Sequence, residues 1–127
     1  MKLRPIGYIR STLRDAASAP KQGADGAPDA WLELDPTLAR ALLGMNAGDE
    51  LIVVTWLHLA DRYTLEVHPR DDLSNPLTGV FSTRSPHRPN PLGLHRVTLR
   101  EIACARLRIG PIEAIDGTPV VDIKSVI

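Results

Sequence analysis

The chain has 127 residues, equal numbers of basic and acidic residues, 43% hydrophobic residues and 24% charged residues, which are proportions typical of a globular protein. One cysteine, Cys104, excludes an intrachain disulfide and a zinc site built from cysteines. No apolar run approaches the roughly 18 residues of a membrane span, and the N-terminus lacks the apolar core of a signal peptide. We therefore expect a single cytoplasmic domain over residues 1–127.

Charge is distributed unevenly along this neutral chain. Twelve of the fifteen basic residues are Arg, and six of these lie from Arg84 to Arg108, where Glu101 is the one acid. Such a stretch favours local binding of an anionic partner, whereas the zero net charge argues against indiscriminate coating of nucleic acid.

The first half of the chain predicts short strands and one long loop. The strands are expected over residues 6–9, 31–34, 51–57 and 64–68. The run over 51–57 is continuously apolar and β-branched, which predicts a central strand buried on both faces. Residues 14–30 are rich in Ala, Asp, Gly and Pro and predict a loop, and a loop of this length is commonly functional or disordered.

One helix is predicted after the second strand. Asp35 suits the N-cap, Pro36 suits the first helical position and Gly44 suits the stop. Helical spacing places three apolar side chains on one face, namely Leu38, Ala41 and Leu42.

Five prolines between residues 69 and 91 exclude regular sheet from most of that segment, because proline lacks a backbone donor and fixes φ. Within it, residues 80–83 alone have strand character. Further strands are expected over 97–101 and 106–109 as a hairpin, and over 112–115 and 120–123 on either side of a tight turn at Asp116-Gly117. About seven short strands and one helix predict a mainly β protein, a small closed antiparallel-rich β-barrel.

The most unusual segment runs from Arg84 to Arg96, with the sequence RSPHRPNPLGLHR. Its three prolines stiffen a loop that presents Arg, His and Asn side chains, and a rigid loop loses little entropy when it binds a ligand. Arg84, Arg88 and Arg96 can each form forked hydrogen bonds with a carboxylate or phosphate. The alternative is a solvated proline-rich turn whose arginines serve solubility, and we favour the functional interpretation.

Four segments together resemble the TsaA/TrmO family, in order and over nearly the whole chain: residues 6–11, 79–85, 88–93 and 116–124. The resemblance implies an S-adenosylmethionine-dependent methyltransferase on a small β-barrel, typically a homodimer. It also implies N6-methylation of threonylcarbamoyladenosine next to the anticodon of tRNA. The chain resembles a short form, without the C-terminal domain of longer members. No Gly-x-Gly-x-x-Gly segment follows a strand, which argues against a Rossmann-type methyltransferase.

The resemblance also implies which residues hold the cofactor. They are Gln22, Gly23, His58, Leu59, Arg84, Leu94, Gly110, Pro111, Ile112 and Glu113. The chemistry of the cofactor fits this set, because an Arg suits its carboxylate and a Glu suits its cationic sulfur. Leu94 and the segment Pro111-Ile112 would supply an apolar wall for its adenine.

On the acceptor side, Arg88, Asn90 and Arg96 are expected to bind the RNA substrate. The acceptor nitrogen carries a proton that must leave, and His58, Asp61 and His87 are the candidates for taking it, with no geometry to choose between them. His58 and Asp61 with His68 also raise the possibility of a metal site, but strand spacing does not bring these groups together, so no metal is expected.

Two other functions remain open. The protein can use the same cofactor on another acceptor, either a small molecule or another RNA. Alternatively, it is a non-catalytic RNA-binding barrel lined by Arg84, Arg88 and Arg96. The second alternative lacks the aromatic stacking platforms of single-strand binders, since the chain has only five aromatic residues.

Overall fold

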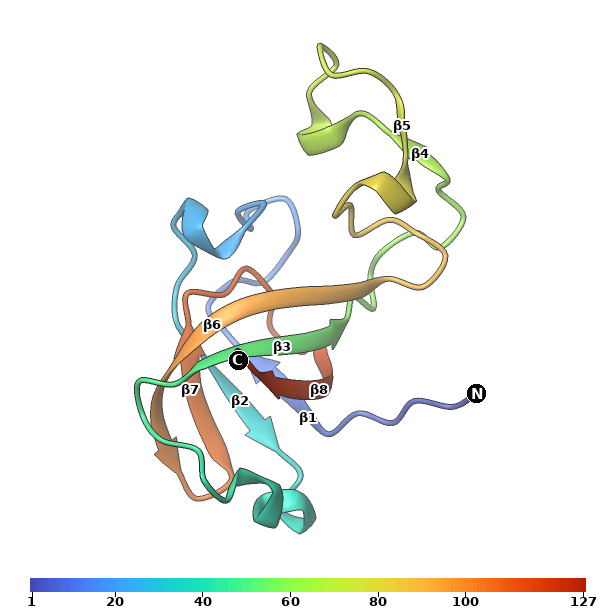
Figure 1. The fold of residues 1–127 in the computed structure, drawn as a ribbon. Helices are drawn as coiled ribbons and strands as arrows, with labels where there is room; N and C mark the ends of the chain where they lie inside the picture. The colour runs from blue at the N-terminus through green and yellow to red at the C-terminus, as the bar shows by residue number, and fades with distance from the viewer.

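Six antiparallel strands close into a barrel in the computed structural model, which describes residues 1–127 (Figure 1). In the order in which they pair around the barrel, the strands are β1 (Gly7–Arg10), β2 (Ala30–Leu34), β7 (Arg106–Gly110), β6 (Leu92–Ala103), β3 (Glu50–Trp56) and β8 (Pro119–Ser125). The prediction of a small closed β-barrel is confirmed. Of eight strands in all, the remaining two form a separate small sheet.

The inside of the barrel is an aliphatic core built by strict alternation along the strands. Its members are Ile9, Ala30, Leu32, Leu34, Leu51, Val53, Val97, Leu99, Leu107, Ile109, Ile112, Ala114 and Val120. The expectation that residues 51–57 are buried on both faces is wrong, because a barrel strand has one inner and one outer face. Along β3, Leu51, Val53 and Thr55 are buried while the residues between them are half-buried.

The expected helix is present as a 3-10 helix, η2 (Pro36–Leu42), which closes one end of the barrel. Asp35 caps it by accepting a hydrogen bond from the Thr37 backbone N–H. Leu38 and Leu42 pack against the core, whereas Ala41 is exposed, because the tighter 3-10 turn changes which side chains share a face.

Residues 58–91, which we call the arm, leave the barrel between β3 and β6 and project from it (Figure 1). The arm carries the two-stranded sheet β4 (Glu66–Val67) and β5 (Thr78–Gly79), so the strand expected over 64–68 shrinks to two residues. The strand expected over 80–83 is wrong. Val80–Ser82 form the 3-10 turn η4, because the chain must bend there to bury Val80.

The C-terminal part departs from the sequence prediction in one pairing. The hairpin of 97–101 with 106–109 is confirmed, and β6 extends back to Leu92, inside the proline-rich motif. The turn at Asp116-Gly117 is present, with Gly117 at φ +85°, but residues 112–115 are not a strand. Ile112 is buried, and its N–H donates to the Pro28 carbonyl oxygen. The partners of β8 are therefore β1 and β3, and not residues 112–115. No helix has the length and apolar character needed to cross a bilayer.

Candidate functional site

The loop that contains η1 (Gly23–Asp25) packs directly on the segment that follows β7. A Cβ atom on residue 23 would lie 2.7 Å from the Pro111 carbonyl oxygen and 3.3 Å from Glu113 Oε2. Only glycine permits this approach without a shift of the backbone. Two segments that are far apart in the sequence, and that were both expected to hold the cofactor, therefore lie in contact.

A buried polar chain connects Glu113 to the interior of the barrel. His95 Nδ1 lies 2.5 Å from Glu113 Oε1, and His95 Nε2 lies 2.7 Å from Thr55 Oγ1. The His95 side chain is 4% exposed and the Glu113 side chain 21%. The sequence patterns did not indicate Thr55 and His95 as site residues. The available signal was a histidine at an inward position of β6.

Gly93 makes room for this chain. A Cβ atom at residue 93 would lie 2.6 Å from Thr55 Oγ1 and 2.8 Å from His95 Nε2. Packing of Thr55 and His95 therefore explains why residue 93, the last of the motif Asn90-Pro91-Leu92-Gly93, is a glycine.

Arg84 and Leu94, two more of the expected cofactor residues, meet on the outer side of β6. The Arg84 guanidinium approaches the Leu94 carbonyl oxygen at 3.5 Å, which is a weak hydrogen bond, and both side chains are exposed. Leu94 faces outward while its neighbour His95 faces inward, so β6 links this cluster to the one at Glu113. His58 and Leu59, at the end of β3, are exposed at the root of the arm.

Two of the expected cofactor residues, Ile112 after β7 and Gly110 at the end of β7, can offer only backbone to a ligand. Ile112 is fully buried in the core, which removes its side chain as a wall for adenine. Gly110 is also buried, and a Cβ there would lie 1.9 Å from Asp29 Oδ1. Pro111 and Glu113 are half-buried and remain accessible. Gln22 is exposed next to Gly23.

Two of the three candidates for proton removal are neighbours, Asp61 and His87. The Asp61 backbone N–H donates to His87 Nδ1 at 3.0 Å. A neutral His87 ring therefore carries its own proton on Nε2 and has no free lone pair. The Asp61 carboxylate accepts hydrogen bonds from the Tyr63 N–H and the Thr64 hydroxyl, and these bonds lower the pKa of Asp61, the Tyr63 bond most.

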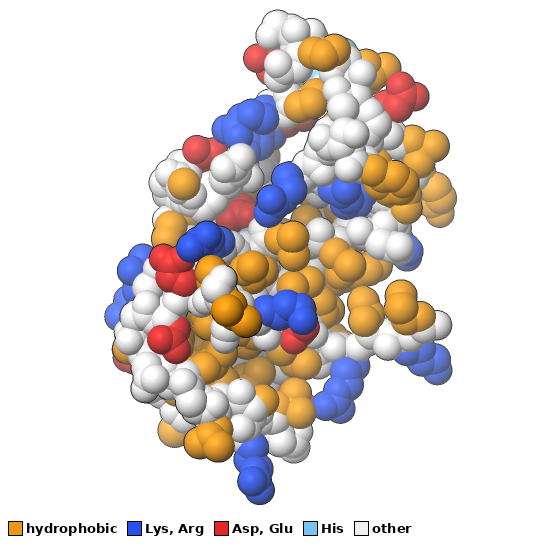
Figure 2. All heavy atoms as spheres, in the orientation of Figure 1, with side chains coloured by type: hydrophobic (Ala, Val, Ile, Leu, Met, Phe, Trp, Pro, Cys, Tyr) orange, Lys and Arg blue, Asp and Glu red, His pale blue; other side chains and the backbone are white.

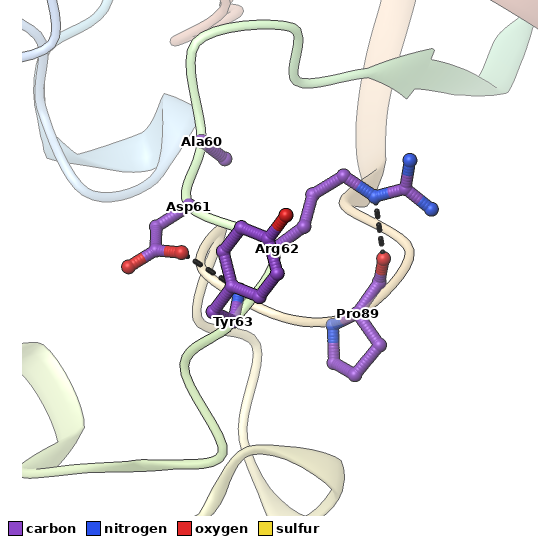
Figure 3. A pocket seen from close by; sticks show the side chains of 5 residues that line it. All are labelled: Ala60, Asp61, Arg62, Tyr63 and Pro89. Atoms are coloured by element: carbon purple, nitrogen blue, oxygen red, sulfur yellow. Dashed lines mark hydrogen bonds between the residues drawn. The ribbon is translucent and has the colours of Figure 1, made fainter.

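Asp61 also lines an open pocket with Ala60, Arg62, Tyr63 and Pro89 (Figure 3). Arg62 Nε donates to the Pro89 carbonyl oxygen, and its guanidinium lies 5.1 Å from the centre of the Trp56 ring. This cation–π contact joins the arm to the barrel wall.

The three residues expected to bind substrate differ in the hydrogen bonds and ion pairs that they already form within the protein. The Arg88 guanidinium donates three hydrogen bonds to backbone carbonyls, those of Val80, Thr83 and Ser85. Asn90 accepts a hydrogen bond from Arg62, and Arg96 forms an ion pair with Glu50. Arg88 therefore holds the motif loop together, and only its remaining N–H groups are left for a ligand.

Carboxylates neutralise most of the Arg-rich stretch from Arg84 to Arg108. The ion pairs are Arg96–Glu50, Arg100–Asp29, Arg106–Glu33, Arg108–Asp29 and Arg108–Glu101. Of the six arginines, only Arg84 and Arg88 lack a carboxylate partner, and Arg88 is held by carbonyls. Arg84 is therefore the arginine best placed to receive a ligand carboxylate.

Two ion pairs join the η1 loop to the arm. Lys21 pairs with Asp71, and Arg70 pairs with Asp25 at 3.1 Å. Arg70 and Asp71 belong to the 3-10 turn η3 (Pro69–Asp71). Figure 2 shows Lys and Arg side chains on the facing sides of the hollow between the η1 loop and the arm. Of the expected cofactor residues, Gln22 and Gly23 belong to the η1 loop, and His58, Leu59 and Arg84 belong to the arm.

No group of three or more His, Cys, Asp or Glu side chains gathers where it could hold a metal ion. His68, one of the residues considered for such a site, instead pairs with the Asn75 carbonyl oxygen through Nδ1.

Comparison with known proteins gives a consistent result. A "Probable S-adenosyl-L-methionine-binding protein" of Methanothermobacter thermautotrophicus is 40% identical over 98% of this chain and 88% of its own length. An "S-adenosyl-L-methionine-binding protein" of Archaeoglobus fulgidus is 36% identical, over 98% of this chain and 88% of its own length. The crystal structure of TrmO from Pseudomonas aeruginosa superposes with a TM-score of 0.78 at 33% identity.

That superposition covers all of this chain but 55% of the Pseudomonas aeruginosa protein, so the chain spans about half the length of that solved relative. The family model for the tRNA-methyltransferase O N-terminal domain matches residues 8–127. The chain therefore belongs to the TrmO family, by its tRNA-methyltransferase O N-terminal domain.

Proposed function

We propose that this protein is an S-adenosylmethionine-dependent methyltransferase that methylates N6 of threonylcarbamoyladenosine in tRNA, next to the anticodon. The observation that carries the proposal is the meeting of η1, the Pro111–Glu113 segment and the Arg84–Leu94 pair around β6. These segments are expected to hold the cofactor, and they come from three distant parts of the sequence, residues 23–25, 84–94 and 111–113. Family membership supports the same conclusion.

The residues present fit this cofactor. Arg84 has a guanidinium without a carboxylate partner, which suits the carboxylate of the methionine end. Pro111 and Leu94 offer accessible apolar surface for the adenine, and Gly23 lets the backbone approach closely. When bound, S-adenosylmethionine supplies an electrophilic methyl group on a positively charged sulfur. The chain's own contribution is then to orient the two reactants and exclude water.

Among the candidates for proton removal, we favour His58. The lone pair of His87 accepts a backbone N–H, and hydrogen bonds hold the pKa of Asp61 low. His58 is exposed just after the end of β3, and Leu59, another residue proposed for the cofactor, follows it in the sequence. Its ring is therefore the one free to accept a proton from the acceptor nitrogen.

We also propose that the protein works as a cytoplasmic homodimer and that residues 1–127 act as one domain. The arm exposes six large apolar side chains, Leu59, Tyr63, Leu65, Leu73, Leu77 and Phe81. An apolar surface of this kind commonly marks a protein interface. Light scattering should give twice the chain mass, and Phe81→Ser combined with Leu65→Ser should give the monomer.

Two experiments test the function. Calorimetric titration with S-adenosylmethionine and S-adenosylhomocysteine should give saturable one-site binding. Methyl transfer is then measured by mass spectrometry on tRNA that carries threonylcarbamoyladenosine and on the same tRNA without that modification. Binding followed by transfer to the modified tRNA alone is the expected result. Binding without transfer to either tRNA would favour a different acceptor, and RNA binding without cofactor binding would favour the non-catalytic barrel.

The non-catalytic alternative has less support than the sequence indicated. It relied on Arg84, Arg88 and Arg96 as a free basic surface, whereas Arg96 is paired with Glu50 and Arg88 binds carbonyls of its own loop.

A further inference from the structure

We propose that His95, held in place by Thr55, is a positioning residue that fixes the Glu113 carboxylate as a ligand contact beside Gly23. The inference rests on the proposed function, because it takes S-adenosylmethionine and its product as the ligands. It adds two residues, one from β3 and one from β6, that sequence comparison with the family motifs did not single out.

The two carboxylate oxygens of Glu113 have different neighbours. Oε1 lies 2.5 Å from His95 Nδ1, while Oε2 lies on the side of Gly23. The imidazole N–H donates to Oε1 and leaves Oε2 with free lone pairs at a side chain that is 21% exposed. A carboxylate held in this way can accept a hydrogen bond from a ligand or face its positive charge, without spending entropy on its own orientation.

Both ring nitrogens of His95 have hydrogen-bond partners. With the proton on Nδ1 directed to Glu113, the Thr55 hydroxyl is the donor to Nε2. Thr55 thereby fixes both the tautomer and the plane of the ring. The arrangement matches the way in which an outer partner orients a functional histidine or carboxylate in many sites.

The packing around His95 also sets this residue apart from the rest of the core. Of the buried residues, only Thr55, His95 and Thr118 are polar, so a histidine inside this small barrel is an exception to an otherwise aliphatic core. No buried side-chain polar atom lacks a hydrogen-bond partner. The contacts run from Thr55 through His95 to Glu113, and a glycine lies at each end of this series. Gly93 lies beside Thr55 and His95, and Gly23 lies beside Glu113. The backbone is thus shaped around these three side chains from the barrel interior to the η1 loop.

The test compares two replacements of His95 that are both polar and both smaller than the ring. His95→Asn keeps an amide N–H near the place of Nδ1, so it can still donate to Glu113. His95→Gln places its amide near Nε2 and leaves Glu113 without that donor. Affinity for S-adenosylhomocysteine is measured by calorimetry on samples whose folding has been checked by circular dichroism. Glu113→Gln and the double variant His95→Gln/Glu113→Gln complete a double-mutant cycle.

We expect His95→Asn to bind within about threefold of the unmodified protein, and His95→Gln and Glu113→Gln each to bind roughly tenfold more weakly. The double variant should be no weaker than Glu113→Gln alone, because His95 acts through Glu113. Equal affinities for the Asn and Gln variants, or losses that multiply in the double variant, would overturn the inference. Absence of binding by the unmodified protein would instead contradict the proposed function.

Three further measurements extend the test. If His95→Gln does not fold, Thr55→Val replaces it, since this substitution removes only the hydroxyl that fixes the ring, and affinity equal to that of the unmodified protein would then refute the role of Thr55. In the ligand-free protein, long-range nitrogen-15 NMR should find the His95 proton on Nδ1, and a proton on Nε2 alone would refute the proposed geometry. A larger loss for S-adenosylmethionine than for S-adenosylhomocysteine in Glu113→Gln would identify the sulfonium as the group that Glu113 faces, whereas equal losses would identify a group that both ligands share.

Discussion

Gly23 lies so close to Pro111 that a Cβ atom on residue 23 would sit 2.7 Å from the Pro111 carbonyl oxygen. The neighbour is backbone, at the start of the segment that leads to Glu113, so it cannot rotate away as a flexible side chain would. Any side chain at residue 23 therefore moves the η1 loop or the Pro111 segment. Because both segments are proposed to hold the cofactor, the contact links loop position to ligand affinity.

Gly23→Ala should accordingly weaken the binding of S-adenosylhomocysteine by roughly tenfold, within the usual range for overpacking a tight contact. Calorimetry measures the change. The matched control is Gly79→Ala, because a Cβ at residue 79 would meet nothing closer than the Leu65 carbonyl oxygen at 4.0 Å. Equal affinities for the two variants would show that the η1 loop does not contribute to binding.

Arg84→Ala should weaken the binding of S-adenosylhomocysteine by about 1–3 kcal/mol, the cost of losing a charge-assisted hydrogen bond to the ligand carboxylate. Arg100→Ala is the control, since Arg100 is another exposed arginine but is paired with Asp29. Binding of 5′-methylthioadenosine, which has no carboxylate, should be the same in both variants. An unchanged affinity of Arg84→Ala for S-adenosylhomocysteine would remove this residue from the site.

Arg88→Ala should lower the free energy of unfolding by about 1–3 kcal/mol, because three backbone carbonyls lose their donor. Arg88→Lys should recover only part of this loss, since an ammonium group cannot match the planar guanidinium fork. Urea denaturation measures both values. If Arg88→Ala is as stable as the unmodified protein yet loses activity on tRNA, then Arg88 contacts RNA directly, as expected from the sequence.

Asp61 should titrate below the ordinary pKa of 3.8, because the Tyr63 N–H and the Thr64 hydroxyl stabilise its ionised form. A carboxyl whose pKa is lower in the folded state stabilises the protein above pH 3.8, and this contribution disappears as the pH falls through the lowered value. Carbon-13 NMR of the carboxyl groups measures the midpoint. Asp61→Asn should lose this acid-side dependence while the pH profile of methyl transfer near neutrality stays the same, and a midpoint above 3.8 would contradict both expectations.

Sequence patterns predicted the barrel better than they predicted the contacts between its side chains. The strands expected at residues 6–9, 31–34 and 106–109 are present as β1, β2 and β7, and one face of each meets the aliphatic core. The strand expected at residues 80–83 failed because tertiary packing of Val80 bends the chain there. Propensity contains no information about such long-range packing.

Sequence patterns also do not indicate which side chains pair with one another. The arginines between Arg84 and Arg108 indicated a basic surface, but their carboxylate partners, such as Glu50 and Asp29, come from other strands and loops. Thr55 and His95 are 40 residues apart, and only the register of β3 against β6 brings their side chains together. The family resemblance named Glu113 and Gly23 without the contacts that connect them.

The ion pair between Lys21 and Asp71 gives a test of the junction between the η1 loop and the arm. Its members are largely exposed, so the pair is expected to contribute no more than about 1 kcal/mol. Lys21 lowers the pKa of Asp71, through its hydrogen bond first and its positive charge second. If the junction orders the cofactor site, Asp71→Lys should weaken the binding of S-adenosylhomocysteine by about two- to fivefold at low salt.

The exchanged variant Lys21→Asp/Asp71→Lys should restore that affinity, because it reverses the pair without changing the composition of the chain. In about 1 M salt the single variant and the unmodified protein should converge, since the screening length falls to about 3 Å. Calorimetry at the two salt concentrations measures both effects. Failure of the exchanged variant to recover would show that Asp71 acts through something other than Lys21, and its partner would then be sought in the ligand.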